Sequence, residues 1–343
     1  MLFYDYTLEM LENYFSERDE NKAKAKILYK ALYRNGLRLS DITELSEKTK
    51  AIIADDFSFE LPAEAALHDD GETAKVLLRL SDGSMVETVL MRHGYNTGVC
   101  VSTQVGCSMG CTFCQSGRLK KIRSLTAGEI VSQVLYMSKR FGNIGHISVM
   151  GIGEPLDNFD NVKAFMEIAS SPYGLSLGGR HITLSTCGIV PYIKRLDEVK
   201  CGFNLAISLH SADSAIRSEI MPVNRRWGID ELIKTVKEYS EKNKQRIAFE
   251  YILIDKLNDS AEQAEKLAAL VKDINCFVNL IPYNPTENSE YRRSENADVF
   301  FDVLKKRGIN AIFRREFGGS IKAACGQLCA ECAEHAEYAE CGK

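Results

Sequence analysis

The clearest chemical signal in this sequence is a set of three cysteines with C-x3-C-x2-C spacing, Cys107, Cys111 and Cys114. They follow residues 98–105, an apolar run that we expect to form a strand. Three thiolates on one short loop can bind three irons of a [4Fe–4S] cluster and leave the fourth iron open to a small molecule. Zinc prefers four tetrahedral ligands, and no histidine or fourth cysteine follows at zinc-finger spacing. The spacing therefore favours a cluster over a zinc site or three buried thiols.

A glycine-rich turn follows the second predicted strand of the same region. Residues 151–155 read Gly-Ile-Gly-Glu-Pro, and such a turn lets backbone carbonyls approach a bound cation closely. Other residues stand at or just after the ends of later predicted strands. The candidates for binding a small molecule beside the cluster are Gly153, Glu154, Ser185, Ser208, Leu209, His210 and Asn284.

Repeated strand-then-helix units from residue 98 onward predict a parallel sheet. The predicted strands are 98–105, 146–150, 181–186, 203–209, 246–253 and 276–282, and the helices between them are near 126–141, 158–169, 189–198, 229–243 and 260–273. Six such units in series imply a sheet that closes fully or partly into a barrel. In barrels the chemistry gathers at the carboxyl ends of the strands, which is where the cysteine loop and the glycine turn lie.

Composition and charge limit the class of protein. At 343 residues, with 45% apolar and 26% charged residues, the chain has the composition of an ordinary globular protein. Its net charge of −4 provides no overall attraction to nucleic acid, so any RNA contact must come from local basic patches. Eleven cysteines, an acidic N-terminus unlike a secretory signal and the lack of a membrane-length apolar run predict a reducing, cytoplasmic location without membrane association.

Two further cysteines complete a pattern that resembles a known family. Cys100 lies seven residues before Cys107, and Cys325 lies in the string Ala-Ala-Cys-Gly-Gln-Leu after the last predicted strand. With Ser-Leu-His-Ser at 208–211 and Met-Pro-Val-Asn at 221–224, these strings resemble the RlmN/Cfr family of radical S-adenosylmethionine (SAM) RNA methyltransferases. The motifs occur in the family's order.

The resemblance implies an α/β fold with a partial (β/α)6 radical SAM barrel at residues 98–316. A small helical N-terminal domain would occupy residues 1–70 and is a candidate RNA contact. A β-hairpin extension at 71–97 would carry Glu87, and residues 317–343 would form a carrier-cysteine loop and a cysteine-rich tail.

The resemblance also implies two cofactors, a [4Fe–4S] cluster bound by the three loop cysteines and SAM bound by the strand-end residues. One SAM would methylate Cys325, and a second would be reduced to a 5′-deoxyadenosyl radical that activates this methyl group. The carbon would then add to C2 or C8 of an adenine in 23S rRNA, with tRNA as a further candidate substrate. Cys100 would release the product by forming a disulfide with Cys325, and Glu87, thirteen residues before Cys100, would accept a proton.

As partners, the resemblance implies the RNA substrate and a low-potential electron donor such as a flavodoxin, and we expect a monomer. The alternatives are a radical SAM enzyme of the same fold that acts on another RNA or a protein, and a non-catalytic Fe–S or zinc protein that binds RNA. The tail could bind zinc or form a flexible thiol-rich end, and its candidate ligands are Cys329, Cys332, His335 and Cys341. Candidate phosphate contacts are the basic pairs at 120–121, 225–226, 292–293 and 314–315.

Overall fold

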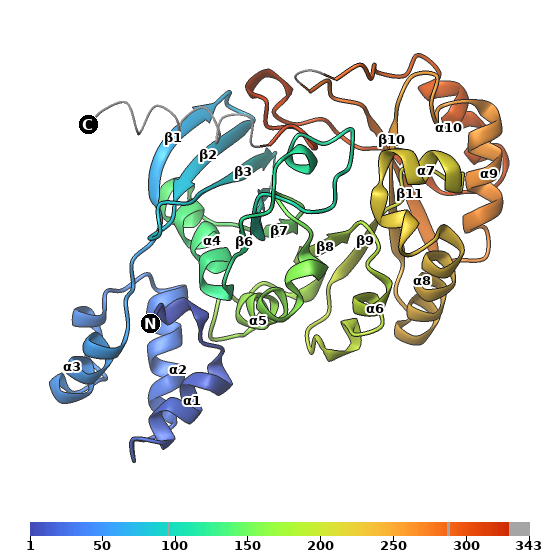
Figure 1. The fold of residues 1–343 in the computed structure, drawn as a ribbon. Helices are drawn as coiled ribbons and strands as arrows, with labels where there is room; N and C mark the ends of the chain where they lie inside the picture. The colour runs from blue at the N-terminus through green and yellow to red at the C-terminus, as the bar shows by residue number, and fades with distance from the viewer. Residues whose placement is uncertain (95, 287–288, 329–343) are drawn as a thin grey trace.

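A curved sheet of ten strands forms the frame of the molecule (Figure 1). The computed structural model describes residues 1–94, 96–286 and 289–328. The strand order is β1-β2-β3-β4-β7-β8-β9-β10-β11-β12, so β1 and β12 are both edges and the sheet stays open. Neighbouring strands are antiparallel from β1 to β4 and parallel from β4 to β12. The open parallel sheet confirms the predicted partial barrel.

The parallel part of the sheet contains the six predicted strands and a short seventh within residues 309–315, where the sequence pattern also predicts a strand. Their bounds are β4 (Asn96–Cys100), β7 (His146–Val149), β8 (Ile182–Thr186), β9 (Asn204–Ser208), β10 (Ile247–Leu253), β11 (Cys276–Pro282) and β12 (Ala311–Phe313). Every residue of β10 is buried, as expected for a strand in the middle of a parallel sheet. Because these strands run in the same direction, their carboxyl ends meet at one edge of the sheet.

Helices follow the strands and pack mainly on the convex side of the sheet (Figure 1). They are α4 (Ala127–Phe141), α5 (Phe159–Ser170), α6 (Val190–Ile193), α7 (Ser214–Ile220), α8 (Ile229–Asn243), α9 (Ala261–Val271) and α10 (Ala297–Lys306). A capping box begins α4: Thr126 Oγ1 accepts from the Glu129 N–H, and the Glu129 carboxylate accepts from the Thr126 N–H. None of the helices in the described ranges combines the length and apolar character that a membrane crossing requires.

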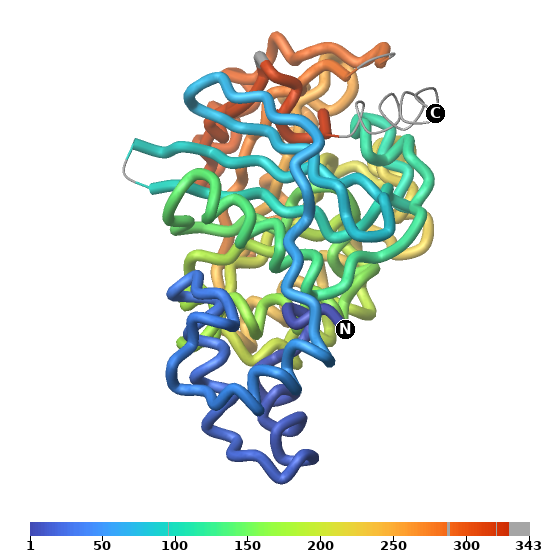
Figure 2. Tube along the Cα trace, turned by 90° about the vertical axis from the view of Figure 1, so that its left-hand side faces the viewer, coloured from blue at the N-terminus to red at the C-terminus, as the bar shows by residue number. Residues whose placement is uncertain are grey.

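The N-terminal segment forms a helical unit at one end of the molecule, as Figure 2 shows from the side. It contains α1 (Leu8–Ser16), α2 (Ala23–Tyr29) with a π-helical turn at Lys30–Arg34, and α3 (Glu47–Asp56). Its core is aromatic, and the rings of Phe3 and Phe57 meet edge to face with their centres 5.7 Å apart. The Gly128 N–H donates to Asp5 Oδ1 at 2.7 Å and so ties this unit to the start of α4.

The N-terminal boundary differs from the sequence-based expectation. The helices of the segment end at Asp56, and β1 (Ala63–Asp69) lies inside the range 1–70 that we expected to be helical. Alanine, glutamate and leucine favour helices, but pairing with β2 (Thr73–Arg79) outweighs that preference here. The predicted hairpin consists of β2 and β3 (Met85–His93), and it joins the main sheet because β3 pairs with β4.

The first predicted strand is divided in two. At the break the N–H groups of Thr103 and Gln104 both donate to the carbonyl of Ile152, at 2.9 and 3.2 Å, so the chain bends toward the turn after β7. The strand continues as β5 (Gln104–Val105), which pairs with β6 (Arg123–Ser124). These two short strands close the base of the loop that carries the three cysteines.

Candidate active site

The cluster loop, residues 106–122, lies between β5 and β6 and carries Cys107, Cys111 and Cys114. Its two ends pack against each other, since the Ile122 N–H donates to the carbonyl of Val105 at 2.8 Å. Gly106 has a φ of +76°, and a Cβ there would collide with the backbone carbonyl of Lys120. The sharp return at the loop base therefore requires glycine.

One cavity brings the cluster loop together with the ends of three parallel strands, and we call it the cofactor cavity. It lies at the carboxyl edge of the sheet, where the turn after β7 and the ends of β8 and β9 meet. The predicted residues that line it are Cys107, Cys111, Cys114, Gly153, Glu154, Ser185, Ser208 and His210. Residues from four separate parts of the chain thus face one volume.

The three loop thiols fit an iron–sulfur cluster. Burial raises the pKa of Cys107 to about 12 and also raises the pKa values of Cys111 and Cys114, so a metal must compensate the charge before these thiols ionise. In the described ranges, no group of three histidine, cysteine or acidic side chains converges on a single metal-ion position. In a cluster each thiolate binds a different iron, so convergence on one point is not required. The donor set therefore suits a cluster better than one zinc ion.

Glu154 joins the glycine turn to the end of β8. Its buried carboxylate accepts hydrogen bonds from Thr186 Oγ1 at 2.6 Å and from the N–H groups of Cys187 and Leu156 at 2.8 and 3.0 Å. Burial raises the pKa of Glu154, and these hydrogen bonds oppose the rise. Gly153 has a φ of +104°, and a Cβ there would lie 2.7 Å from a neighbouring side chain. Glu154 therefore fixes the shape of the cavity wall.

Polar side chains at the ends of β8 and β9 form another wall of the cofactor cavity. The hydroxyl oxygens of Ser185 and Ser208 are 3.4 Å apart. His210 has a φ of +57°, and burial lowers its pKa to about 3, so the ring is neutral. Its Nδ1 accepts from the Ile252 N–H at 3.2 Å, which leaves Nε2 as the protonated nitrogen. The wall thus offers hydroxyl groups and one imidazole donor without a fixed charge.

Two predicted cofactor contacts lie elsewhere. Leu209 is fully buried, and its backbone donates to the Glu250 carbonyl at 3.0 Å and accepts from Arg217 Nε at 3.0 Å. Asn284 lines a second cavity that also contains Cys325. Neither residue belongs to the described lining of the cofactor cavity.

The second cavity, which we call the thiol cavity, contains the two cysteines singled out beyond the cluster loop. Cys100 and Cys325 both line it, and Cys325 lines the cofactor cavity as well. Burial raises the pKa of Cys100 to about 12, and the neighbouring Cys325 adds to this rise. Both residues are free thiols in this structure. Cys325 therefore stands at the junction of the two cavities.

The segment around Cys325, residues 317–328, is attached to the cluster loop, and we call it the carrier loop. The Gln115 N–H donates to the Gly326 carbonyl at 2.7 Å, and Ser116 Oγ donates to the Leu328 carbonyl at 3.1 Å. Gln327 adds a hydrogen bond from its amide to the Pro285 carbonyl at 3.0 Å. These bonds fix Cys325 beside the loop that carries the three cluster cysteines.

Glu87 lies on β3, on the same face of the strand as the residue that pairs with Cys100. Val89 pairs with Cys100 across β3 and β4, and Glu87 is two residues earlier on β3. Glu87 is fully buried, and its Oε1 lies 3.6 Å from Nζ of Lys75, which is itself buried.

Arg314 is a site residue that sequence reasoning assigned differently. As part of a basic pair it was a candidate phosphate contact, but it lines both cavities and its Nη1 lies 3.3 Å from Glu250 Oε2. Its Nη2 donates to Met150 Sδ at 3.5 Å. The neighbouring Cys325 and Glu250 both raise the pKa of Arg314 above its usual value. The only sequence signal for this role is its position after the last strand.

The tail ligands proposed for zinc lie outside the described residues.

Comparison with known proteins finds relatives whose descriptions agree with one another. Residues 101–270 match the Radical SAM superfamily. Over 301 residues the chain is 45% identical to "Probable dual-specificity RNA methyltransferase RlmN" of Spiroplasma citri, with 86% of this chain and 87% of that protein covered. The protein of the same name from Enterococcus faecalis is 43% identical, with 95% of each chain covered. The crystal structure of a radical SAM methyltransferase from Sphaerobacter thermophilus gives a TM-score of 0.89 at 39% identity and covers 95% of this chain and 98% of that one.

The cluster assignment predicts the effect of removing its three ligands. A variant with alanine at Cys107, Cys111 and Cys114 should lose the visible iron–sulfur absorbance and the roughly four irons per chain expected after anaerobic reconstitution. Cys201→Ala is the matched control, since this thiol is also partly buried but lies away from the cavities. A triple variant that still binds a [4Fe–4S] cluster would show that the tail cysteines are ligands.

Proposed function

The chain belongs to the RlmN family of radical SAM RNA methyltransferases, and we propose that it methylates an adenine carbon, C2 or C8, in 23S rRNA and also in tRNA. The observation that carries the methyl-cysteine route is the position of Cys325 at the junction of the two cavities. A thiol in that position can meet a cofactor on one side and a nucleobase on the other. Covalent transfer through such a group divides one difficult step into two easier ones.

Membership of the family implies a [4Fe–4S] cluster and SAM. The cluster ligands in this proposal are the three cysteines of the cluster loop. Residues that would contact SAM are those predicted from the strand ends that line the cofactor cavity, Gly153, Glu154, Ser185, Ser208 and His210. Asn284 lies in the adjoining thiol cavity, and Leu209 supports the wall from the core. When bound, these cofactors supply the methyl group and the one-electron chemistry that an unreactive amidine carbon requires.

The protein's own thiols carry and release the methyl carbon in this proposal. Cys325 holds the carbon as a thioether next to the substrate. Cys100, which shares the thiol cavity, attacks the sulfur of Cys325 after transfer, so that a disulfide forms as the sulfur–carbon bond breaks. Glu87, whose Oε1 lies 3.6 Å from Lys75 Nζ, accepts the proton that leaves the adenine carbon.

The direct test of the function is nucleoside mass mapping of 23S rRNA and tRNA from cells with and without the gene. We expect one methyladenosine to disappear from 23S rRNA, and its comparison with C2- and C8-methyladenosine standards assigns the carbon. An unchanged set of RNA nucleosides would contradict the proposal.

A methyl group on Cys325 should be present in protein isolated from cells that can load the cluster, because methylation of the carrier precedes attack on the substrate. Mass spectrometry of the peptide that contains residues 323–327 should show one added methyl. Cys325→Ala should lose RNA methylation and keep the cluster. A methyl group on Cys329 instead would contradict the assignment of the carrier.

The role of Cys100 predicts a trapped intermediate. Cys100→Ala should accumulate protein covalently attached to RNA through Cys325, because transfer of the carbon precedes the step that this substitution blocks. Denaturing electrophoresis with labelled RNA measures the adduct, and Cys276→Ala is a control at a partly buried thiol outside the thiol cavity. Normal turnover by Cys100→Ala would show that Cys100 is not the thiol that releases the product.

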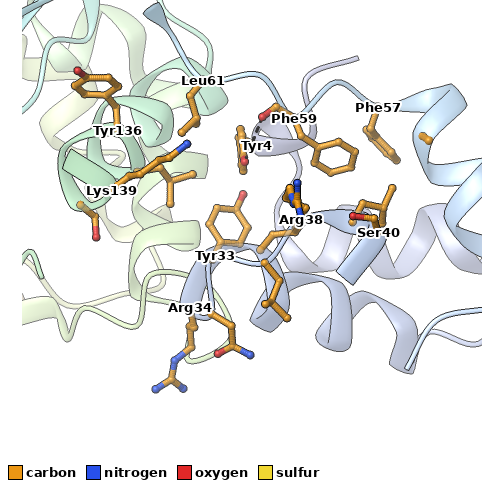
Figure 3. Close-up of a pocket in the computed structure, with 18 of the residues that line it drawn as sticks. Tyr4, Tyr33, Arg34, Arg38, Ser40, Phe57, Phe59, Leu61, Tyr136 and Lys139 are labelled. Atoms are coloured by element: carbon orange, nitrogen blue, oxygen red, sulfur yellow. Dashed lines mark hydrogen bonds between the residues drawn. The ribbon is translucent and has the colours of Figure 1, made fainter. Parts of the chain in front are cut away.

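We propose that RNA contacts the N-terminal segment at a cleft between this segment and α4. It has a volume of about 1400 Å³ and is lined from both sides by basic residues. Figure 3 shows Lys139 extending from α4 toward the N-terminal segment, which contributes Arg34 and Arg38. Among the described residues, Arg34 and Lys139 have no carboxylate partner, whereas Arg38 is paired with Asp41. Unpaired cations facing each other across a cleft suit a phosphate backbone.

Removal of one of these cations should weaken RNA binding mainly at low salt. For Lys139→Ala we expect the slope of log affinity against log salt concentration to fall by about 1, the value for one lost phosphate contact. Lys234→Ala on α8 is the control, because Lys234 is also exposed and lies away from the cleft. Equal salt slopes for both variants and the unmodified protein would show that RNA does not use the cleft.

A further inference from the structure

A second surface groove lies next to the first half of the cluster loop, and we call it the loop groove. Ser108 and Met109 of the cluster loop form one side, and residues around α6 and before α8 form the other. Met109 also lines the cofactor cavity with the three cluster cysteines. Met109 therefore borders both the outer groove and the cavity of the predicted cluster.

The lining of the loop groove has the composition of a protein interface. Tyr192 and Trp227 are partly exposed in it, beside apolar Pro222. The Arg226 guanidinium lies 4.6 Å from the centre of the Trp227 ring, and Arg226 is itself exposed. Tryptophan, tyrosine and arginine are enriched in protein interfaces.

The uncompensated charge at the loop groove is positive. Asp157 lies 2.7 Å from Lys121 Nζ, so its charge is balanced. Arg195 pairs with two carboxylates, Asp160 and Glu198, which leaves one negative charge in that group against the two positive charges of Arg225 and Arg226. Arg225 and Arg226 are exposed, and neither forms an ion pair with any part of the chain that the structure describes. A partner with an acidic surface would therefore be attracted to this groove.

We infer that the loop groove is the docking surface for an acidic protein that delivers single electrons to the cluster. The inference rests on the proposed function, because a cluster that must be reduced from outside requires such a partner. In the step, a reduced flavin or iron–sulfur centre of the donor loses one electron, and the cluster accepts it in passing from the 2+ to the 1+ state. Redox partners bind through small interfaces, so one groove provides enough surface.

RNA is the competing occupant, and the surroundings favour a protein. The second half of the cluster loop, at Gln115 and Ser116, is covered by the carrier loop, and the thiol cavity that must receive the nucleobase lies there. The loop groove borders the first half instead. Its walls are largely apolar and aromatic, with Tyr192, Pro222 and Trp227 among the lining residues. Such walls are poorly suited to a phosphate backbone.

Binding can be measured without enzyme activity because Trp227 is the only tryptophan in the chain. The reconstituted protein is labelled with 5-fluorotryptophan and titrated with oxidised flavodoxin as the acidic probe. We expect its single ¹⁹F resonance to shift or broaden, and the change to disappear at high salt, since the attraction is electrostatic. Titration with substrate RNA should leave the resonance unchanged.

Electron delivery is tested with the double variant Arg225→Glu/Arg226→Glu, which reverses two exposed charges. With flavodoxin and its reductase, the flavodoxin concentration for half-maximal cleavage of SAM to 5′-deoxyadenosine should rise roughly 10-fold or more. With dithionite, a small reductant that needs no docking surface, the rate should stay unchanged. The control is Arg180→Glu/Lys272→Glu, which reverses two exposed charges before β8 and β11, at the opposite edge of the sheet.

Three results would overturn the inference: an unchanged ¹⁹F resonance with flavodoxin, a ¹⁹F response to RNA in its place, or equal losses of rate with dithionite and flavodoxin. The proposed function fails separately. If the unmodified protein methylates no RNA with dithionite while flavodoxin still perturbs Trp227, the docking surface stands and the RNA substrate is wrong.

Discussion

The hydrogen bond from the Gln115 N–H to the Gly326 carbonyl, 2.7 Å long, is the contact on which the site depends. With the bond from Ser116 to Leu328, it joins two loops that are 212 residues apart in sequence. Both partners in the Gln115–Gly326 hydrogen bond are backbone groups. The bond therefore depends on the course of the chain more than on side-chain identity. Gly326 has a φ of +85°, which lets the carrier loop turn its carbonyl toward the cluster loop. Together with the hydrogen bond from Gln327 to Pro285, this attachment holds Cys325 between the two cavities.

The open sheet makes room for that attachment. Because β1 to β3 extend the sheet beyond β4, a row of residues faces the carrier loop: Lys75 lies opposite Val89, and Val89 lies opposite Cys100. Ala323 and Leu328 of the carrier loop pack against Val89 in a small apolar cluster. A closed barrel would have no free edge at β4 for this extension. The antiparallel strands β1 to β3 therefore provide the surroundings of Cys100 and contain the buried Lys75–Glu87 pair.

The sequence was sufficient to predict those parts of the site that follow from strand direction. Ser208 ends β9, Glu154 lies just after β7 and Cys107 lies a few residues beyond β4, and the carboxyl ends of these parallel strands must meet. Contacts that depend on how distant segments pack were not predictable in this way. Arg314 reads as a surface cation in sequence, and only the approach of β10 shows that Glu250 is its partner. β1 has a helix-like composition, and its pairing with β2 is a tertiary effect.

The two halves of the cluster loop have different neighbours, and this division has a consequence for the chemistry. Gln115 and Ser116 contact the carrier loop, whereas Ser108 and Met109 face the loop groove. A base that enters the thiol cavity and an electron that enters through Met109 would approach the cluster from different sides. Neither partner would need to leave before the other binds. In the proposed function, the same short loop would hold the cluster, support Cys325 and provide a path for reduction, because each task uses different residues of it.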